Sequence, residues 1–277
     1  MITGVVLSYS ENLARDFQWC AENGIPSCQL STPPELETEE TAKIIDSART
    51  AHGMTITALV GTWSGPNEWN FTAGPATLGI VPRAYRAMRL QELERCAKFA
   101  HRLGVSDMCT HMGFIPENPA DPLYTETVPA IRHLAAICKG LGLRLNMETG
   151  QETPATLLRT ISDVGADNLG LNFDPANLLM YGKANPIDAL SVVGPYINGV
   201  HAKDGLYPVD GVNLGQEMPL GEGAVQIEAF VRKLIEIGYD GALTIEREIS
   251  GEQQRQDVLA ANRLLLAILD KLGGRLA

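Results

Sequence analysis

Four polar residues suited to metal binding or acid–base chemistry stand near the ends of the last four predicted β-strands. They are Glu148 in Leu-Asn-Met-Glu-Thr-Gly, Asp174 in Leu-Asn-Phe-Asp-Pro, His201 in Val-His-Ala-Lys-Asp and Glu246 in Thr-Ile-Glu-Arg-Glu. An apolar residue comes directly before each of them. Because side chains along a strand point alternately to its two faces, apolar neighbours that face helices would leave all four polar side chains pointing to a common interior.

Three carboxylates and one imidazole that meet in a cleft require either raised carboxyl pKa values or a compensating cation. Each residue alone has an ordinary explanation, such as a helix cap, an ion pair or a satisfied core histidine. Their occurrence on four successive strands favours a shared metal site instead. Carboxylate-rich sets that include one nitrogen ligand suit several divalent ions. We therefore predict one divalent metal ion, which could be Mn, Co, Mg or Zn, and the carboxylate-rich set favours Mg or Mn.

Short β-branched or apolar runs alternate with segments of helical periodicity along the whole chain. We predict strands at Ile2–Ser8, Ser27–Ser31, Met54–Val60, Val105–His111, Leu143–Glu148, Leu169–Asp174, Ile197–Lys203 and Ala242–Glu246. We predict helices near Glu11–Asn23, Glu37–His52, Pro82–Leu103, Thr125–Leu141, Thr153–Val164, Pro186–Val193, Ala224–Ile237 and Gln253–Leu272. Eight strand–helix units in 277 residues favour an α/β fold, a closed (β/α)8 TIM barrel that forms a single domain over residues 1–277.

Glycine residues punctuate the predicted units in a regular way. A glycine lies at the end of six predicted helices, at positions Gly24, Gly53, Gly104, Gly142, Gly165 and Gly238. Glycine tolerates the left-handed conformation that commonly ends a helix, so the repeated placement supports one helix-to-strand unit used many times.

Three loops on the expected active face leave alternatives open. The loops 61–81 and 112–124 carry Trp63, Trp69, Phe71 and Phe114, which could cover a sugar ring or only hold long loops down. The segment Gly221-Glu222-Gly223 could present N–H groups to a phosphate, but a tight turn is favoured because Glu222 would repel an anion.

Composition excludes several functional classes. The net charge of −11 argues against nucleic-acid binding, and the basic run from Arg83 through Arg89 to Arg102 is interpreted as a solvated helix surface. Five scattered cysteines without a CxxC pair indicate reduced thiols and a cytoplasmic location. No secretory signal is recognised, and no apolar run approaches the ~20 residues that cross a membrane. We expect a small-molecule partner, no nucleic acid and no membrane, and leave homo-oligomerisation open.

The four motifs around Glu148, Asp174, His201 and Glu246 resemble those of the xylose isomerase-like TIM-barrel sugar isomerases and epimerases. The resemblance covers almost the whole chain, including Asn-Phe-Asp-Pro-Ala-Asn-Leu at residues 172–178. It implies that the four residues bind one catalytic metal ion, with Mn favoured and Mg, Co and Zn as alternatives. It also implies that Glu148 and Glu246 act as acid and base on opposite faces of a carbohydrate substrate.

This resemblance implies proton movement next to a carbonyl group. One glutamate would remove a proton to give an enediolate, and the other would return a proton to the same carbon or to its neighbour. The first outcome is epimerisation and the second is aldose–ketose isomerisation. An inosose or polyol dehydratase with the same metal site, and a non-catalytic sugar-binding barrel, are alternatives. Zinc endonucleases of the same superfamily need more ligands than five histidines supply and a surface that binds phosphates.

The motifs also depart from those of the ketose 3-epimerases, which carry three further substrate-contacting residues. Where those enzymes have a His, a Glu and an Arg, this chain has Asn177, Pro154 and Tyr207. A different hydroxylated substrate is therefore expected. Our candidates for substrate contacts are His111, Asn177, Lys203, Glu152 and Trp63, and we expect Arg247 to form a structural ion pair.

Overall fold

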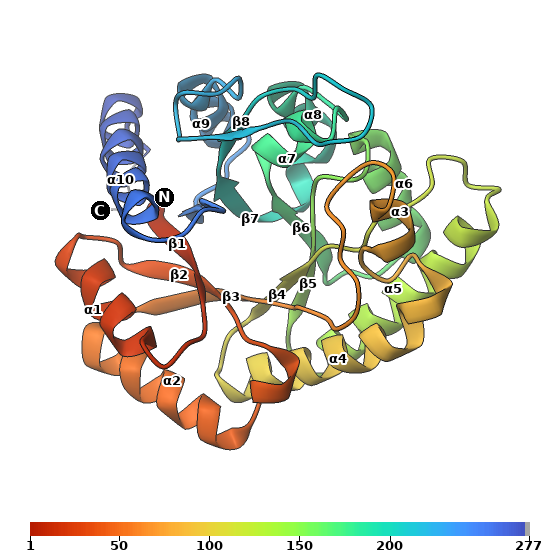
Figure 1. The fold of residues 1–277 in the computed structure, drawn as a ribbon, viewed down its shortest axis with the longest axis horizontal. Helices are drawn as coiled ribbons and strands as arrows, with labels where there is room; N and C mark the ends of the chain where they lie inside the picture. The colour runs from red at the N-terminus through yellow and green to blue at the C-terminus, as the bar shows by residue number, and fades with distance from the viewer. Residues whose placement is uncertain (275–277) are drawn as a thin grey trace.

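Eight parallel strands close into a barrel in the computed structural model of the chain, which describes residues 1–274. Around the barrel the strands follow the order β1-β10-β7-β6-β5-β4-β3-β2 (Figure 1). Their bounds are β1 Ile2–Ser8, β2 Ser27–Ser31, β3 Thr55–Val60, β4 Asp107–Thr110, β5 Arg144–Glu148, β6 Leu169–Phe173, β7 Ile197–Ala202 and β10 Ala242–Ile245. The predicted (β/α)8 fold is confirmed.

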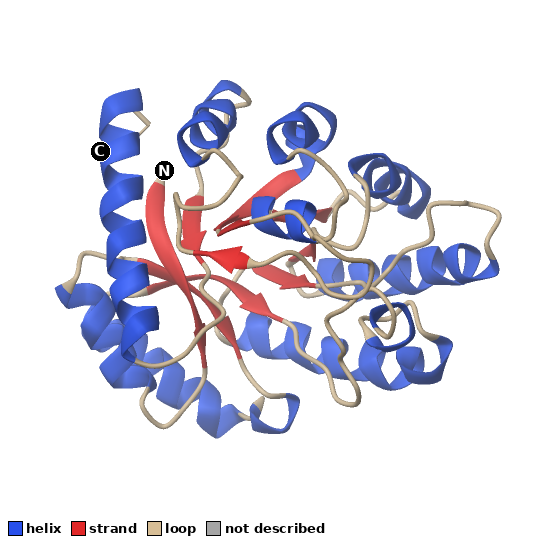
Figure 2. Cartoon of the chain, turned by 45° about the horizontal axis from the view of Figure 1, so that its top comes forward, coloured by secondary structure: helices blue, strands red, loops and turns tan. Residues whose placement is uncertain are grey.

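Helices cover the outside of this barrel (Figure 2). They are α1 Leu13–Glu22, α2 Glu39–His52, α4 Arg83–Arg102, α5 Pro122–Gly140, α6 Pro154–Val164, α8 Pro186–Val193, α9 Ile227–Glu236 and α10 Glu252–Leu272. The short helices α3 Gly74–Thr77 and α7 Pro175–Met180 lie in the segments that follow β3 and β6, and 3-10 turns occur at Pro34–Leu36 and Gly194–Tyr196. The N-terminal ammonium group donates to the Gly274 carbonyl at 2.9 Å, so α10 closes the ring of helices beside β1.

The apolar core lies between the strands and the helices. Helix α4 buries Leu93, Ala97 and Ala100, which recur at three- and four-residue steps along one face, while Leu90 on the same face is only partly buried. The barrel interior is more polar, since Gln29 and Asn172 are buried there and hydrogen-bonded to each other at 2.8 Å. Apolar burial therefore stabilises the outer layer, and amides cross the inner space.

All six glycines that were expected to end helices have positive φ angles. Gly53 (φ 64°) and Gly165 (φ 65°) are helix C-caps, and their backbone N–H groups donate to carbonyls of the preceding helices. The repeated helix-to-strand unit seen in the sequence is confirmed.

The structure contains elements that periodicity did not reveal. Helices α3 and α7 are only four and six residues long, and the two-residue strands β8 (Asp204–Gly205) and β9 (Glu217–Met218) form an antiparallel hairpin. Such lengths are too short for a helical or alternating pattern to stand out. Helix α9 begins at Ile227, three residues later than expected, because the preceding segment forms a hydrogen-bonded turn on Asp204.

Arg89 corrects the interpretation of the basic run as a solvated surface. Its side chain is fully buried, and its guanidinium donates to the carbonyls of Thr77 and Gly79 at 2.6 and 2.7 Å and of Pro66 at 2.7 Å. The guanidinium reaches these carbonyls from two different nitrogens, whereas a lysine would have to reach all three from its single Nζ. The arginine thus holds the long loop 61–81 in place over the barrel.

Two composition-based expectations can be compared with the structure. All five cysteines are buried free thiols, as expected for a chain without a disulfide framework. Across residues 1–274, no helix combines the length and the apolar character needed to cross a bilayer.

A pair of glycine substitutions tests the close approach of the two long loops. Gly79 and Gly104 have nearly equal φ angles (64° and 65°), but a Cβ atom on Gly79 would overlap the Met112 carbonyl whereas Gly104 faces open space. We expect Gly104→Ala to cost about 1–2 kcal/mol, the penalty of the left-handed conformation alone, and Gly79→Ala to cost more than about 3 kcal/mol. Denaturant unfolding measures both values, and equal losses would contradict the described loop contact.

Candidate metal centre

The four predicted ligands converge at the C-terminal mouth of the barrel. Glu148 is the last residue of β5, His201 lies in β7 and Glu246 directly follows β10. Asp174 follows β6 and caps α7, where its Oδ1 accepts the Asn177 N–H at 2.8 Å, so Oδ2 is left to face the centre. One donor atom from each of the four residues lies within 4.8 Å of the others.

His201 stands at the middle of this group. Its Nδ1 lies 3.3 Å from Glu148 Oε1, 3.4 Å from Asp174 Oδ2 and 3.2 Å from Glu246 Oε2. Glu148, Asp174 and His201 are at most 4% exposed, so water screens these charges poorly. The apolar residues directly before the four predicted ligands are Met147, Phe173, Val200 and Ile245. All four are buried in the hydrophobic core, as the predicted alternation of side chains along the strands requires.

The acid groups and the imidazole shift one another's pKa values. Burial opposes ionisation of Glu148, but His111 and His201 outweigh it and lower the Glu148 pKa to about 2. Burial also opposes the charge on His201, yet Glu246 and Glu148 raise its pKa well above the ordinary value. Burial raises the Asp174 pKa, although Lys203 and His201 oppose the shift. The cluster thus needs positive charge among its carboxylates.

This donor set fits a divalent cation. Three carboxylate oxygens and one imidazole nitrogen are hard or intermediate ligands that Mn, Mg, Co and Zn accept. The fit rests on convergence as well as on residue type, because the four atoms come from four different strand ends and face one another.

Two amides lie behind the His201 ring. Gln29 Oε1, an acceptor, and Asn172 Nδ2, a donor, each lie 2.9 Å from Nε2, so the ring tautomer decides which of them is hydrogen-bonded. When Nε2–H donates to Gln29 Oε1, the lone pair of Nδ1 is directed at the three carboxylates, which is the tautomer that a metal ligand requires. The sequence analysis did not single out Gln29 or Asn172; the only available signal was that amides are unusual at inward positions of strands.

Lys203 is buried next to the centre. Its Nζ lies 3.0 Å from Glu246 Oε2, 3.1 Å from Glu248 Oε2 and 3.8 Å from Asp174 Oδ2. Asn177 Oδ1 lies 3.3 Å from the same atom. Lys203 and Asn177, both predicted substrate contacts, are thus brought together beside Glu246, and the lysine orients that glutamate.

His111 extends the cluster on its other side. Its Nε2 lies 3.2 Å from Glu148 Oε1, and its Nδ1 lies 3.2 Å from Gln151 Oε1. The Trp69 ring packs edge-on against His111, with ring centroids 5.0 Å apart. Trp63, the tryptophan that we had selected, lies under the Arg89 guanidinium at 5.4 Å, so its role in substrate binding stays a prediction.

Aromatic rings from both long loops meet at one tyrosine. Phe71 and Phe114 make edge contacts with Tyr181, with centroids 6.3 and 5.7 Å apart. Tyr181 follows α7, and no sequence pattern pointed to it because that helix was not predicted. The rings therefore pack around the buried side chain of Tyr181, as expected if they hold the long loops down, and their role in covering a sugar ring stays a prediction.

Glu152 is the remaining predicted contact. It is 1% exposed, and burial raises its pKa to about 8 although His111 opposes the shift. A carboxyl group with this pKa is neutral at pH 7 and can donate a hydrogen bond.

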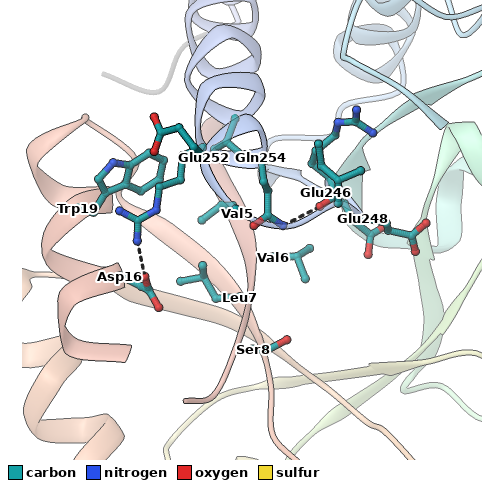
Figure 3. Close-up of a pocket in the computed structure, with 15 residues that line it drawn as sticks. Val5, Val6, Leu7, Ser8, Asp16, Trp19, Glu246, Glu248, Glu252 and Gln254 are labelled. Atoms are coloured by element: carbon teal, nitrogen blue, oxygen red, sulfur yellow. Dashed lines mark hydrogen bonds and ion pairs between the residues drawn. The ribbon is translucent and has the colours of Figure 1, made fainter. Parts of the chain in front are cut away.

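A groove opens beside Glu246 (Figure 3). Its volume is about 770 Å³, and it is lined by the end of β1, by Asp16 and Trp19 of α1 and by the start of α10. Glu246, one of the four predicted ligands, lines this groove together with Glu248 (Figure 3).

Two structural interpretations from the sequence hold at the rim. Arg247 forms the expected ion pairs, at 2.8 Å to Glu217 and at 2.8 Å to Asp257. The segment from Gly221 to Gly223 is a turn whose N–H groups donate to Asp204 Oδ2 at 3.0 and 3.1 Å.

The contact between Gln29 and His201 generates a prediction about metal affinity. Replacing Gln29 by Met keeps the length of the side chain but removes the acceptor for Nε2–H, so the ring loses its orientation. We expect Gln29→Met to lower Mn²⁺ affinity about 10- to 100-fold, the usual effect of losing such a partner. Calorimetric titration measures this, with Gln18→Met on the exposed face of α1 as the control; unchanged affinity in Gln29→Met would refute the role.

Glu152 generates a prediction about pH. The unfolded carboxyl has a pKa near ~4.3, and the folded one has a pKa of about 8. Between these pH values Glu152 is protonated in the folded protein but ionised in the unfolded chain. The free energy of unfolding therefore falls as the pH rises from ~4.3 to about 8. Glu152→Gln removes this cost, so its gain in thermal midpoint should be larger at pH 8 than at pH 5. The exposed Glu40→Gln serves as the control; equal gains at both pH values would count against the assignment.

This chain is similar to known proteins both in its sequence and in its fold. A family model described as "Xylose isomerase-like TIM barrel" matches residues 17–267. Among curated proteins, an uncharacterized protein of Methanocaldococcus jannaschii is 26% identical over 174 residues, which are 59% of this chain and 58% of that protein. The chain thus matches less than two thirds of that relative's length.

Solved structures extend the similarity over the full chain. A xylose isomerase domain protein from Planctomyces limnophilus is 36% identical, with 99% of both chains covered and a TM-score of 0.93. A D-tagatose 3-epimerase-like protein is 19% identical, with both chains fully covered and a TM-score of 0.77.

Two less similar structures share the fold. One is a xylose isomerase-like TIM barrel protein from Mycobacterium smegmatis in complex with magnesium (20% identity, 94% and 89% coverage, TM-score 0.71). The other is a probable 3-DHS dehydratase, AsbF, from Bacillus anthracis (17%, 95% and 99%, 0.68). The match of the family model over most of the sequence, together with the closed barrel, shows that this chain belongs to the xylose isomerase-like TIM barrel family.

Proposed function

We propose that this protein is a divalent-metal-dependent sugar isomerase, either an epimerase or an aldose–ketose isomerase. The observation that carries the proposal is the convergence of Glu148 and Glu246 on His201 from strands that are separated by β7 and β6 in the barrel. Two glutamates that approach one point from different sides can reach both faces of a bound substrate. The similarity to a D-tagatose 3-epimerase-like protein supports the same reading.

Glu148, Asp174, His201 and Glu246 would hold the metal ion, with Mn favoured. A divalent ion at this place supplies Lewis-acid polarisation of a carbonyl group and its neighbouring hydroxyl, which acidifies the adjacent C–H bond. A protein with the same fold was solved in complex with magnesium, which supports a divalent ion in this protein.

Glu148 and Glu246 would move the protons. The glutamate on one face of the substrate removes a proton from the carbon next to the carbonyl, and the other returns one from the opposite face. Return to the same carbon inverts it, whereas return to the neighbouring carbon exchanges aldose and ketose. Lys203 Nζ, 3.0 Å from Glu246 Oε2, orients that carboxylate. His111, 3.2 Å from Glu148 Oε1, does the same for Glu148.

The aromatic residues would shield this chemistry from water. Trp69 packs on His111, and Phe71 and Phe114 pack on Tyr181, so rings from both long loops stand beside the acid groups. Exclusion of water strengthens the electrostatic interactions inside the site. The five buried thiols support a further proposal, that the protein works in the reducing cytoplasm.

A dehydratase that acts on an inosose or another polyol is the second candidate. The same glutamates would remove a proton next to the carbonyl and then protonate a departing hydroxyl. The fold shared with a probable 3-DHS dehydratase favours keeping this alternative. The third candidate is a barrel that binds a sugar without catalysis. Such a function would not require two glutamates on opposite sides of the ligand.

Substitution of Glu246 separates these readings. We expect purified protein to retain about one divalent ion per chain and to catalyse exchange of a substrate C–H proton with solvent deuterium, measured by NMR on a panel of ketoses, aldoses and inososes. Glu246→Gln keeps the size of the side chain but removes the base, so exchange should fall by at least about 100-fold while sugar still binds. Chelation of the metal should stop exchange in the parent protein.

The matched control is Glu228→Gln, which removes a partly exposed carboxylate on α9 that is paired with Lys271 at 2.7 Å. This variant should keep the metal content and exchange rate of the parent. Loss of a hydroxyl without prior exchange would favour the dehydratase, and sugar binding without any turnover in the parent would favour the binding barrel.

A further inference from the structure

We propose that the barrel interior binds an ordered water molecule behind His201, held by the hydroxyl of Thr244 and by the side-chain amides of Gln29 and Asn172. This site lies beyond the reaction proposed above and does not depend on it. Three observations carry it: a small polar cavity inside the barrel, a buried hydroxyl without a partner in the cavity wall, and a histidine nitrogen that two amides approach at once.

A small cavity lies inside the barrel, deeper than the candidate metal centre. Four residues that line it each come two positions before one of the four predicted ligands: Asn146, Asn172, Gly199 and Thr244. Because side chains alternate along a strand, these positions share the inward direction of the ligands. The volume of the cavity is about 30 Å³, close to the share of one water molecule in the liquid.

Small residues leave room for this cavity. A closed barrel of eight strands usually fills its interior with bulky branched side chains. Here Ala58, Gly199 and Ala242 line the cavity instead. A Cβ atom on Gly199 would stand 2.3 Å from Asn172 Oδ1, so only glycine fits at this position while the amide stays in place. The interior is thus built from small residues and amides, and it has space for a small polar molecule.

One hydroxyl in the cavity wall has no hydrogen-bond partner within residues 1–274. It belongs to Thr244, which is 0% exposed and whose Oγ1 atom is buried. Thr244 in β10 is the register partner of His201 in β7, so the two side chains point inward next to each other. A buried hydroxyl without a partner costs free energy, and ordered water commonly satisfies such groups.

Two amides in the same wall supply further partners. Gln29 and Asn172 both line the cavity, and Gln29 Nε2 donates to Asn172 Oδ1 at 2.8 Å. An amide nitrogen carries two hydrogens, so the second hydrogen of Gln29 Nε2 remains for another acceptor. The Thr244 hydroxyl can both donate and accept. Together these groups offer the roughly two to four polar partners that a buried water needs.

The opposite wall is already paired, which favours a neutral molecule over a cation. Asn198 Nδ2 donates to Asn146 Oδ1 at 2.8 Å, and Asn146 Nδ2 donates to Asp107 Oδ1 at 2.9 Å. The same carboxylate pairs with Arg144 at 2.8 Å. The negative charge of Asp107 is therefore compensated by the chain itself, and the cavity presents amides and hydroxyls rather than free charge.

The water also influences which amide pairs with His201. Gln29 Oε1 and Asn172 Nδ2 each lie 2.9 Å from Nε2. In the tautomer that a metal ligand requires, Nε2 carries the hydrogen and donates to Gln29 Oε1, so Asn172 Nδ2 has to donate elsewhere. A water molecule held by Thr244 gives that nitrogen an acceptor. The site therefore favours the ring tautomer that directs the Nδ1 lone pair at the three carboxylates.

Removal of the hydroxyl tests the site by the sign of a stability change. Thr244→Val keeps the shape of the side chain. Loss of a hydroxyl that binds nothing would leave the thermal midpoint unchanged or raise it, because an unpaired buried group is removed. With a bound water we expect the midpoint to fall by roughly 2–4 °C, the effect of one lost hydrogen bond.

The matched control is Thr127→Val. It removes another buried hydroxyl that has no partner within residues 1–274, on α5 outside the barrel. This variant should not lower the midpoint. A midpoint that stays equal or rises in Thr244→Val, as in the control, would overturn the proposed water site.

Mn²⁺ affinity, measured by calorimetric titration, tests the link to His201. Thr244→Val should lower the affinity about 3- to 10-fold, because Asn172 then competes for Nε2. Thr244→Ser keeps the hydroxyl and should keep the affinity of the parent protein. Unchanged affinity in Thr244→Val, or an equal loss in both variants, contradicts this link.

A crystal structure of the Mn²⁺-loaded protein tests the site directly. We expect an ordered water within hydrogen-bond distance of Thr244 Oγ1 in the parent protein and no such water in Thr244→Val. A direct hydrogen bond between Asn172 and Thr244 would overturn the proposal. A monovalent cation at this place, revealed by replacement of potassium with rubidium, would also overturn it.

Discussion

Buried negative charge around one imidazole is the constraint on which the structure of this barrel depends. Glu148, Asp174 and Glu246 each place an oxygen within 3.4 Å of His201 Nδ1, in a site that water barely reaches. Such a cluster costs free energy unless positive charge compensates it. His201, in β7, and Lys203, which directly follows β7, supply part of that charge. The cations of one strand thus balance the carboxylates at the ends of other strands.

This constraint explains why the barrel interior differs from the layer outside it. Between strands and helices the core is apolar, and Leu145 and Phe173 are fully buried there. Inside, Gln29 links Asn172 and His201 across the barrel, from strands that are far apart in the sequence. A purely apolar interior would leave the back of the imidazole without a partner. The polar interior is thus part of the support for the site rather than a defect of packing.

Most of the fold and the four candidate ligands could be predicted from the sequence, because the patterns that indicate them are long or repeated. The eight strand–helix units appear in alternating patterns, and the inward placement of the four candidate ligands follows from the apolar residue before each of them. Residues on short elements could not be found in this way. Tyr181 follows a six-residue helix, and Trp69 was not separable from Trp63 because both lie in a loop without periodicity. Gln29 was missed because only the closed barrel brings it to His201, 172 positions away.

The ion pairs of Arg247 restrict how the segments at this face of the barrel can vary in sequence and length. It fastens the hairpin strand β9 through Glu217 and the last helix through Asp257, and Glu217 also accepts the Glu248 N–H. Loops on this face of a barrel usually diverge freely without disturbing the scaffold. Here the backbone next to Glu246 is shared with two separate segments, so neither can lengthen or shift alone. Substitutions at positions 217, 247 and 257 should therefore occur together. Among the loops on this face of the barrel, the β8–β9 hairpin should diverge most slowly.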